Sequence, residues 1–281
     1  MVTTYGTVPS HSEEIKVSFP AEHVMLLTLN RPKKLNAVGP QMRAEIGTVL
    51  NWFEDEPSLW VVIVTGEGRA FCAGADLSAW NETYKDGNSN ESQTIASSLH
   101  GFASISRRQT SNKPIIAAVN GPAYGGGVEL ILNCDLVVAS DQAVFALPEV
   151  KRGVVAAEGA IPRLAAVAGH QLASELLLLG NTVSAIEARD RFRFVNRVVP
   201  ASAVLETALS LAAIVTENSP DSVQSSKRGL IFSQQLPVEE AVRAHALGDV
   251  GRRVYRGENI KEGLAAFAEK RKPRWKNPAR L

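Results

Sequence analysis

Short runs of apolar residues alternate with stretches of helical periodicity over the first 200 residues of the chain. Apolar runs of about four to eight residues, bounded by Gly, Pro or Asn, are typical of strands buried in a sheet. The predicted strands are Ile15–Phe19, Val24–Asn30, Trp60–Thr65, Pro114–Val119, Asp135–Ala139 and Val144–Leu147, and the predicted helices are Pro40–Glu54 and Val128–Leu132.

The pattern changes after Val199-Pro200, where helical periodicity alone continues. Alternating strands and helices followed by helices only predict an α/β core with a helical tail. We therefore divide the chain into a leader (residues 1–14), a core (15–200) and a C-terminal helical region with a short tail (201–281). A polar stretch at 79–100 is long enough to be a functional or mobile loop. The predicted tail helices are Ala203–Glu217, Pro220–Phe232, Val238–Leu247 and Asn259–Lys270.

Composition excludes several classes of protein. The 281 residues are 45% hydrophobic with a formal net charge of +1, which argues against disorder and against a general nucleic-acid-binding surface. No apolar run reaches the roughly 18 residues that a membrane span needs. Two cysteines, Cys72 and Cys134, do not make a disulfide scaffold and favour a reducing compartment. The five histidines show no metal-ligand spacing, so we expect no metal.

A glycine-rich turn follows the predicted strand Pro114–Val119. It reads Asn120-Gly121-Pro122-Ala123-Tyr124-Gly125-Gly126-Gly127-Val128-Glu129 and leads into a helix. Glycines there admit a ligand close to the backbone, and the first helical N–H groups have no partner within the helix. Such donors suit a negatively charged oxygen. The turn lacks G-x-G-x-x-G spacing, so it does not predict a dinucleotide site; a tight packing turn is the simpler alternative.

A second segment changes the balance between these interpretations. The strand Trp60–Thr65 runs into Arg69-Ala70-Phe71-Cys72-Ala73-Gly74-Ala75-Asp76-Leu77. With this segment the chain resembles the crotonase superfamily, the enoyl-CoA hydratases and isomerases, over roughly residues 15 to 276. The matching pieces are Leu29-Asn30-Arg31-Pro32 with Asn36-Ala37, Ala73-Gly74-Ala75-Asp76-Leu77, Asn120 through Glu129, Asn133-Cys134-Asp135, Pro148-Glu149, and Glu262 through Arg271.

The resemblance implies a fold and a way to bind a thioester. The expected fold is an α/β, crotonase-like spiral of ββα turns with a C-terminal helical region. The backbone amides of Ala75 and Gly126 would form an oxyanion hole for the thioester oxygen. Because backbone groups supply the donors, the side chains at these positions need only be small.

The resemblance also implies two catalytic carboxyls, Glu129 and Glu149, that hold and activate a water molecule. Two carboxyls that share one water must differ in protonation, because adjacent anions in a dry pocket repel each other. In one division of labour, Glu129 takes a proton from water and Glu149 delivers a proton to the α-carbon. A surface or capping carboxylate is the simpler explanation for either residue alone.

The same resemblance suggests residues that contact substrate or coenzyme A. No cofactor is expected, because the CoA thioester is itself the substrate. Trp80 and the polar loop after it would form part of the acyl-pocket wall, whereas Asp135 is expected to be a structural partner for backbone amides. The suggested substrate and CoA contacts are Lys33, Lys34, Ala73, Asp76, Leu77, Ser78, Gly125, Phe267 and Lys270.

One segment departs from the family pattern. A Pro-Gly-Ala-Gly-Gly-like stretch is usual after the second glutamate, whereas this chain reads Gly153-Val154-Val155-Ala156-Ala157-Glu158-Gly159-Ala160. Glu158 is expected to cap the helix that starts near Gly159, where a negative charge is favourable. In the alternative, Glu158 lines the acyl pocket and selects a polar or cationic acyl group.

Several functions remain open at this point. The first hypothesis is an enoyl-CoA hydratase that gives a 3-hydroxyacyl-CoA. An isomerase that moves a proton with one glutamate is the second, and a hydratase for a branched, aromatic or carnitine-like acyl group is the third. A non-catalytic acyl-CoA-binding or RNA-binding relative is disfavoured, because both glutamates are present and the net charge is near zero.

The end of the chain suggests a location and an assembly. Ala279-Arg280-Leu281 has the small–basic–leucine form of the peroxisomal Ser-Lys-Leu signal, so we expect a peroxisomal protein, or otherwise a cytoplasmic one. The resemblance implies that the C-terminal helices pack between subunits of a homotrimer or homohexamer. We expect neither a nucleic acid nor a membrane as a partner.

Overall fold

In the computed structural model, which describes residues 5–77 and 90–279, the larger sheet has six strands. Its order is β1-β2-β3-β4-β6-β9, with β1 and β2 antiparallel and every other neighbouring pair parallel. Parallel strands buried on both faces appear in sequence as continuous apolar runs, which explains why they were predictable. The strands are β1 (Ile15–Ala21), β2 (Val24–Leu29), β3 (Val61–Gly66), β4 (Ile115–Val119), β6 (Leu136–Ser140) and β9 (Arg197–Val199).

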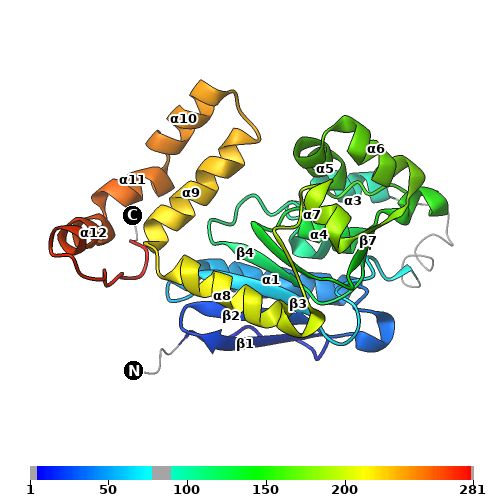
Figure 1. Ribbon diagram of the computed structural model, residues 1–281, viewed down its shortest axis with the longest axis horizontal. Helices are drawn as coiled ribbons and strands as arrows, with labels where there is room; N and C mark the ends of the chain where they lie inside the picture. The colour runs from blue at the N-terminus through cyan, green and yellow to red at the C-terminus, as the bar shows by residue number, and fades with distance from the viewer. Residues whose placement is uncertain (1–4, 78–89, 280–281) are drawn as a thin grey trace.

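One helix packs on each face of this sheet (Figure 1). Side chains alternate along a strand, so Val62 and Val64 of β3 join one core while Val61 and Ile63 join the other. Helix α1 (Pro40–Asp55) buries its apolar residues in the first core, and α8 (Val204–Thr216) buries Val204, Ala208 and Leu211 in the second. The first helix of the predicted C-terminal region thus packs on the sheet of the core.

A smaller sheet carries the turn that the sequence singled out. It has the order β5-β7-β8, with β5 (Ala123–Tyr124) parallel to β7 (Val144–Ala146), and β7 antiparallel to β8 (Thr182–Ser184). The glycine turn follows β5, and Glu149 follows β7. Pairing between β5 and β7 therefore brings together two sequence segments that carry the candidate site.

The remaining helices form two groups. Those near the small sheet are α3 (Glu91–Ser97), α4 (Gly126–Ile131), α5 (Ala160–Ala168), α6 (His170–Leu179) and α7 (Ala185–Asp190). Those that extend away from the core at the C-terminal end are α9 (Pro220–Ser233), α10 (Val238–Leu247), α11 (Asp249–Arg256) and α12 (Glu258–Ala268) (Figure 1). Short 3-10 turns are η1 (Pro32–Lys34), η2 (Phe102–Ser104), η3 (Pro148–Arg152) and η4 (Ala201–Ala203).

All of the predicted strands and helices occur with boundaries shifted by a few residues at most. The loop predicted for 79–100 is wrong in part, because α3 occupies Glu91–Ser97; residues 78–89 lie outside the described chain. The sequence reasoning did not predict β5, β8, β9, α6, α7 or α11. These elements are short or lack a long apolar run, so local periodicity carried little signal for them.

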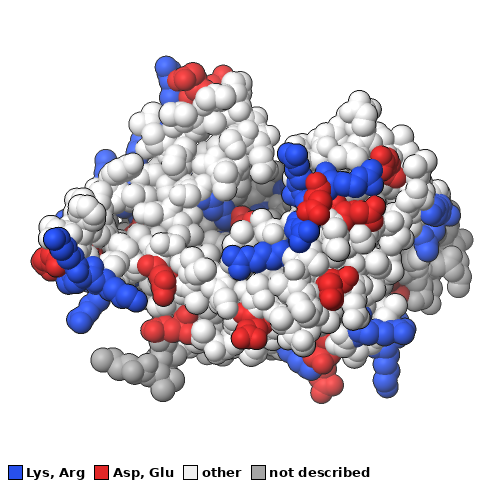
Figure 2. All heavy atoms as spheres, in the orientation of Figure 1, with Lys and Arg blue, Asp and Glu red and all other residues white. Residues whose placement is uncertain are grey.

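Apolar side chains remain exposed on the C-terminal helices, among them Leu230, Val242, Leu264 and Phe267. Their exposure fits the expectation of a homo-oligomer, which stays a prediction. On the face shown in Figure 2, acidic and basic side chains are interspersed. Among the described residues, no helix is long and apolar enough to cross a membrane.

Candidate active site

Two glycine-containing segments approach each other at the centre of the site. Gly74 has φ +90°, and a methyl group placed on it would lie 3.2 Å from the amide nitrogen of Gly126. The segments are held together by the Tyr124 N–H, which donates to the carbonyl of Cys72 at 2.9 Å. Only a glycine at position 74 allows the backbone of one segment to pack this closely on the other.

This packing places the Ala75 and Gly126 amides in the same region. Helix α4 begins at Gly126, so the N–H of Gly126 has no partner within the helix. The Ala75 N–H likewise donates to no other group in the part of the chain that the structure describes, although its neighbours Gly74 and Asp76 bond to Val38. The two amides are the pair that the sequence suggested as an oxyanion hole.

Glu129 lies on α4 and is 4% exposed. One carboxylate oxygen accepts a hydrogen bond from the N–H of Ala160 at 3.1 Å. Burial raises the pKa of Glu129 to about 7, and the nearby charges of Glu149 and Glu158 add to this rise. Near neutral pH, Glu129 can therefore exist either as a base or as an acid.

Glu149 follows β7 in the 3-10 turn η3. Its Oε2 atom is buried and has no hydrogen-bond partner among the described residues. Burial raises the pKa of this carboxyl as well. A buried oxygen without a partner is costly unless water or a ligand satisfies it, so this atom indicates where a polar molecule binds.

These groups surround one cavity of about 490 Å³. Its size is in the range of pockets that hold small molecules. Phe102, from η2, also lines it, and the Phe102 ring lies against Gly126 so closely that a methyl there would come within 2.6 Å. Of the residues suggested from sequence, the cavity is lined by Ala73, Ala75, Leu77, Gly125, Gly126, Glu129 and Glu149.

The residues suggested for coenzyme A are distributed over the molecule. Asp76 lines a neighbouring cavity of about 700 Å³, and its carboxylate pairs with Arg31 at 3.0 Å and with Lys34 at 2.9 Å. Lys33 is exposed beside them. Ser78 and Trp80 lie outside the described residues.

Phe267 and Lys270 are not near this cavity within one chain. Phe267 lies on α12, and Lys270 follows that helix. Helix α12 is at the opposite end of the molecule from α4 and β7 (Figure 1). Any contact of these residues with CoA would therefore have to involve another subunit.

The expected helix-capping role of Glu158 is wrong. Helix α5 does begin after Gly159, but its N-cap is Gly159 and no side chain caps it. The Glu158 carboxylate turns instead to Arg43 on α1, with Oε2 2.6 Å from a guanidinium nitrogen. A bidentate partner for the whole carboxylate outweighs the weak attraction of an exposed helix end.

Sequence reasoning missed Arg43 and Phe102 because neither stands in a motif and both reach the site through tertiary packing. Asp135, in contrast, has the structural role expected of it, since its Oδ2 accepts from the Ile115 N–H at 2.7 Å. Among the described residues, no cluster of His, Cys, Asp and Glu has the arrangement of a metal site.

Comparison with known proteins identifies the family of this chain. A family model described as enoyl-CoA hydratase/isomerase matches residues 20–278. The mevalonyl-coenzyme A hydratase of Aspergillus fumigatus is 45% identical over 265 residues, covering 94% of this chain and 95% of that protein. The carnitinyl-CoA dehydratase of Proteus mirabilis is 38% identical over 256 residues, covering 90% and 95%.

Solved structures agree with the sequence comparison. The crystal structure of an enoyl-CoA hydratase from Mycobacterium tuberculosis superposes with a TM-score of 0.84 at 33% identity, covering 94% of this chain and 99% of the other. The crotonase-like α/β fold expected from the sequence is thereby confirmed.

Proposed function

Because the chain belongs to the enoyl-CoA hydratase/isomerase family and is a hydratase, a carbon–oxygen lyase, we propose that Glu129 and Glu149 activate the water that it adds to a 2-enoyl-CoA. The observation that carries this proposal is the placement of both carboxyls around one cavity, together with two amides that donate to no other group among the described residues. The reacting water would bind at Oε2 of Glu149, which has no hydrogen-bond partner in the described part of the chain.

The Ala75 and Gly126 amides stabilise the reaction's negative charge. As water attacks C3 of the enoyl group, charge develops on the thioester oxygen, and two fixed N–H donors aimed at that oxygen lower the barrier. Loss of one such donor costs about 3 to 4 kcal/mol in transition-state stabilisation. Both donors belong to the backbone and need no rearrangement during the reaction.

The two glutamates divide the proton transfers. Glu129 takes a proton from water as the oxygen attacks C3, and Glu149 delivers a proton to the α-carbon. A pKa of about 7 for Glu129 leaves a large fraction ionised at neutral pH while keeping it basic enough to accept a proton. In the dehydration direction, the same two groups exchange roles.

We further propose a short, branched and hydroxylated acyl group as the substrate. The mevalonyl-coenzyme A hydratases of Aspergillus fumigatus and Beauveria bassiana, 45% and 41% identical to this chain, support this choice. A mevalonyl group is a branched acyl group with a hydroxyl at its far end. The carnitinyl-CoA dehydratases share less identity, at 38%, which makes a carnitine-like substrate the weaker candidate.

Further proposals concern binding and location. Lys33, Lys34 and the backbone near Asp76 would contact the phosphates and pantetheine of CoA. Phe267 and Lys270 would reach the adenosine end from a neighbouring subunit of a homotrimer or homohexamer. The C-terminal Ala279-Arg280-Leu281 would direct the protein to peroxisomes in cells that import this signal, where it would serve acyl-CoA metabolism such as β-oxidation.

The test is a screen of purified protein against enoyl-CoAs in oxygen-18 water, with products identified by mass. A hydratase of this kind places the heavy oxygen on C3 of the product, with the highest kcat/KM for a branched, hydroxylated acyl group. A shifted double bond without heavy oxygen would identify double-bond isomerisation instead. Preference for a straight unsubstituted chain would overturn the substrate assignment and leave hydration intact.

A further inference from the structure

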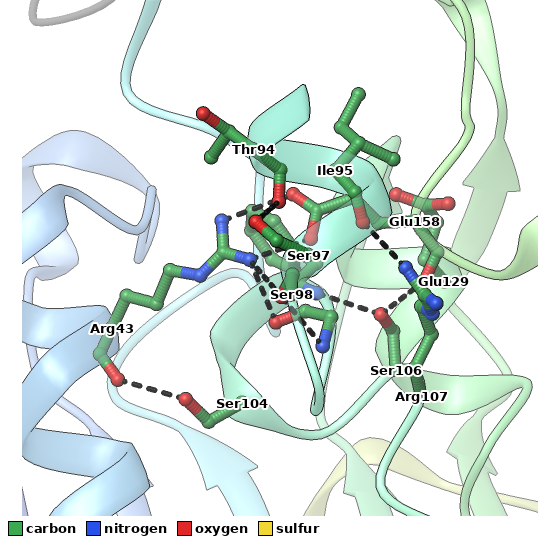
Figure 3. A network of polar contacts seen from close by, with 12 residues as sticks. Arg43, Thr94, Ile95, Ser97, Ser98, Ser104, Ser106, Arg107, Glu129 and Glu158 are labelled. Atoms are coloured by element: carbon green, nitrogen blue, oxygen red, sulfur yellow. Dashed lines mark hydrogen bonds and ion pairs between the residues drawn. The ribbon is translucent and has the colours of Figure 1, made fainter. Parts of the chain in front are cut away.

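An ion pair between Arg43 and Glu158 adjoins the candidate active site (Figure 3). The two guanidinium Nη atoms of Arg43 donate separately to the two carboxylate oxygens, at 3.0 Å to Oε1 and at 2.6 Å to Oε2. Arg43 lies on α1, and Glu158 precedes α5, 115 residues later. Paired N–H···O bonds of this type fix the plane and direction of a carboxylate as well as its position.

The surroundings hold both members of the pair in place. Arg43 also donates to the hydroxyl of Ser98 at 2.9 Å and to the carbonyl of Gly101 at 3.0 Å. The backbone carbonyl of Glu158 accepts from Ser106 Oγ at 2.5 Å. The Glu158 side chain is only 12% exposed. The carboxylate is therefore fixed before any substrate binds.

Glu158 lines the same cavity as Glu129 and Glu149, and it also lines the neighbouring cavity that contains Arg43. The proton transfers of hydration already have two carboxyls and do not require a third. The two oxygens of Glu158 each accept one hydrogen bond from Arg43, and a carboxylate oxygen can accept a second. The Glu158 carboxylate, which lines the cavity, thus retains acceptor capacity.

The net charge of the Arg43–Glu158 pair determines which kind of acyl group it can bind. Arg43 neutralises Glu158, so the pair has no net charge to attract a cationic acyl group. A carboxylate on the acyl chain would be repelled by Glu129 once that group is ionised. A neutral hydroxyl group fits, because it donates to the fixed carboxylate without adding charge to the cavity.

We propose that Glu158, held in place by Arg43, determines specificity by accepting a hydrogen bond from a hydroxyl group on the acyl chain beyond the reacting double bond. Glu158 is the residue that contacts the substrate, and Arg43 is a positioning residue. This inference rests on the proposed hydration of an enoyl-CoA, and it assigns the residue that selects the acyl group.

The test compares two substrates that differ only in that hydroxyl, the CoA thioesters of 3-methylpent-2-enoic acid and of its 5-hydroxy derivative. The main variant replaces the pair by apolar groups of similar size, Arg43→Met together with Glu158→Leu, because this leaves no unpaired charge. Glu158→Gln is the second variant. Glu175→Gln, which removes an exposed partner of Arg191 away from the cavity, is the matched control.

We expect wild-type protein to favour the hydroxylated substrate in kcat/KM. The ratio of the two kcat/KM values should fall by at least about tenfold in both cavity variants, since a hydrogen bond to a charged group is lost only with that substrate. The rate for the substrate without the hydroxyl should fall by a smaller factor, caused by the change in charge near Glu129 and shared by both substrates, so the ratio of the two kcat/KM values carries the test. The control variant should keep the wild-type ratio.

Three results would overturn the inference. Equal losses for both substrates in the variants would show that the pair only supports the shape of the site. Equal kcat/KM values for both substrates in the wild type would remove the hydroxyl preference while leaving hydration established. A wild type that hydrates neither substrate, nor any other enoyl-CoA, would overturn the proposed function and this inference with it.

Discussion

The carboxylate of Glu149 occupies the space that a side chain at Gly125 would need. A methyl group on Gly125 would lie 2.6 Å from Oε1 of Glu149. Gly125 also has φ +54° and ψ −121°, a conformation that residues with a Cβ rarely adopt. Glycine is thus required at position 125 both by the contact with Glu149 and by the backbone conformation. The two requirements can be tested separately.

Gly125→Ala should lower kcat/KM for hydration by at least about 100-fold, because the new methyl displaces a carboxyl that transfers a proton. Gly169→Ala is the matched control, since Gly169 has φ +83° but a methyl group added to it would meet nothing within 4 Å. Both variants should lose roughly 1 to 3 kcal/mol of stability from backbone strain. Similar activity in the two variants would show that the contact with Glu149 is unimportant.

Glu129→Gln and Glu149→Gln should each retain the fold and reduce hydration by about 100- to 10,000-fold, the usual contribution of general acid–base catalysis. Binding of a saturated acyl-CoA, measured by calorimetry, should persist because the amides of Ala75 and Gly126 are unchanged. A nearly silent Glu129→Gln beside an inactive Glu149→Gln would favour a single-base isomerase.

The raised pKa of Glu129 predicts a pH-dependent stability. Its ordinary value is 4.5 and its value in the folded protein is about 7, so between these pH values the folded state holds the proton more tightly than the unfolded state. The contribution of Glu129 to the free energy of unfolding therefore falls as pH rises from about 4.5 to about 7, by roughly 1.4 kcal/mol per pH unit at most.

Replacing the Glu129 carboxyl by an amide removes its contribution to the pH dependence of stability. Glu129→Gln should be more stable than wild type at pH 8 and nearly equal to it at pH 4.5, as measured by urea unfolding at each pH. The acid side of the kcat/KM profile should have an apparent pKa near 7, because Glu129 must be ionised to take a proton. A stability difference that does not change with pH would contradict the assignment.

Lys227 connects the C-terminal helices to the core. Its ammonium group, on α9, donates to the carbonyl of Lys113 and to Oδ2 of Asp135, both at 2.8 Å, and the side chain is 7% exposed. Lys227→Met should lower the free energy of unfolding by about 2 to 3 kcal/mol, because it leaves a partly buried carboxylate and a carbonyl without this partner.

The control for this prediction is Lys261→Met, which breaks an exposed pair with Glu258. The thermal midpoint of this variant should stay at the wild-type value, since exposed ion pairs contribute little. Equal effects of the two substitutions would mean that Lys227 does not tie α9 to the core.

The C-terminal signal can be tested without disturbing the fold. The N–H of Ala279 donates to Oδ1 of Asp221 at 3.2 Å, so a deletion restricted to Arg280 and Leu281 retains that bond. The truncated protein should keep full hydratase activity, and an N-terminally tagged form should move from peroxisomes to the cytosol in fluorescence images. Cytosolic location of the intact chain would refute the targeting role and leave the enzyme assignment unaffected.

Local patterns were sufficient for most of the sheet, and the resemblance of short motifs to the family pointed to Ala75, Gly126, Glu129 and Glu149. The buried strands are continuous apolar runs, and glycine at a strand-to-helix turn is required by backbone conformation within the turn itself. Such signals depend on neighbours in sequence, so they can be recognised before any tertiary contact is known.

The roles of Glu158 and Asp76 could not be obtained in this way. Glu158 precedes a helix, and the local rule predicts a cap, but Arg43 on a distant helix provides two charged hydrogen bonds to its carboxylate. The Asp76 carboxylate likewise pairs with Arg31 and Lys34, which lie more than 40 residues earlier.

By itself, the sequence determined five of the six strands of the larger sheet and which residues stand at the glycine turn, because each depends on short-range order along the chain. It also determined the family, because several short motifs occur in the family's order. Only the tertiary structure decided the ionisation of Glu129 and the partner of Glu158. Burial sets the first, since a carboxyl removed from water holds its proton more tightly. The second depends on which helix packs beside the cavity, because the energy of an ion pair comes from distance in space and not from separation in sequence.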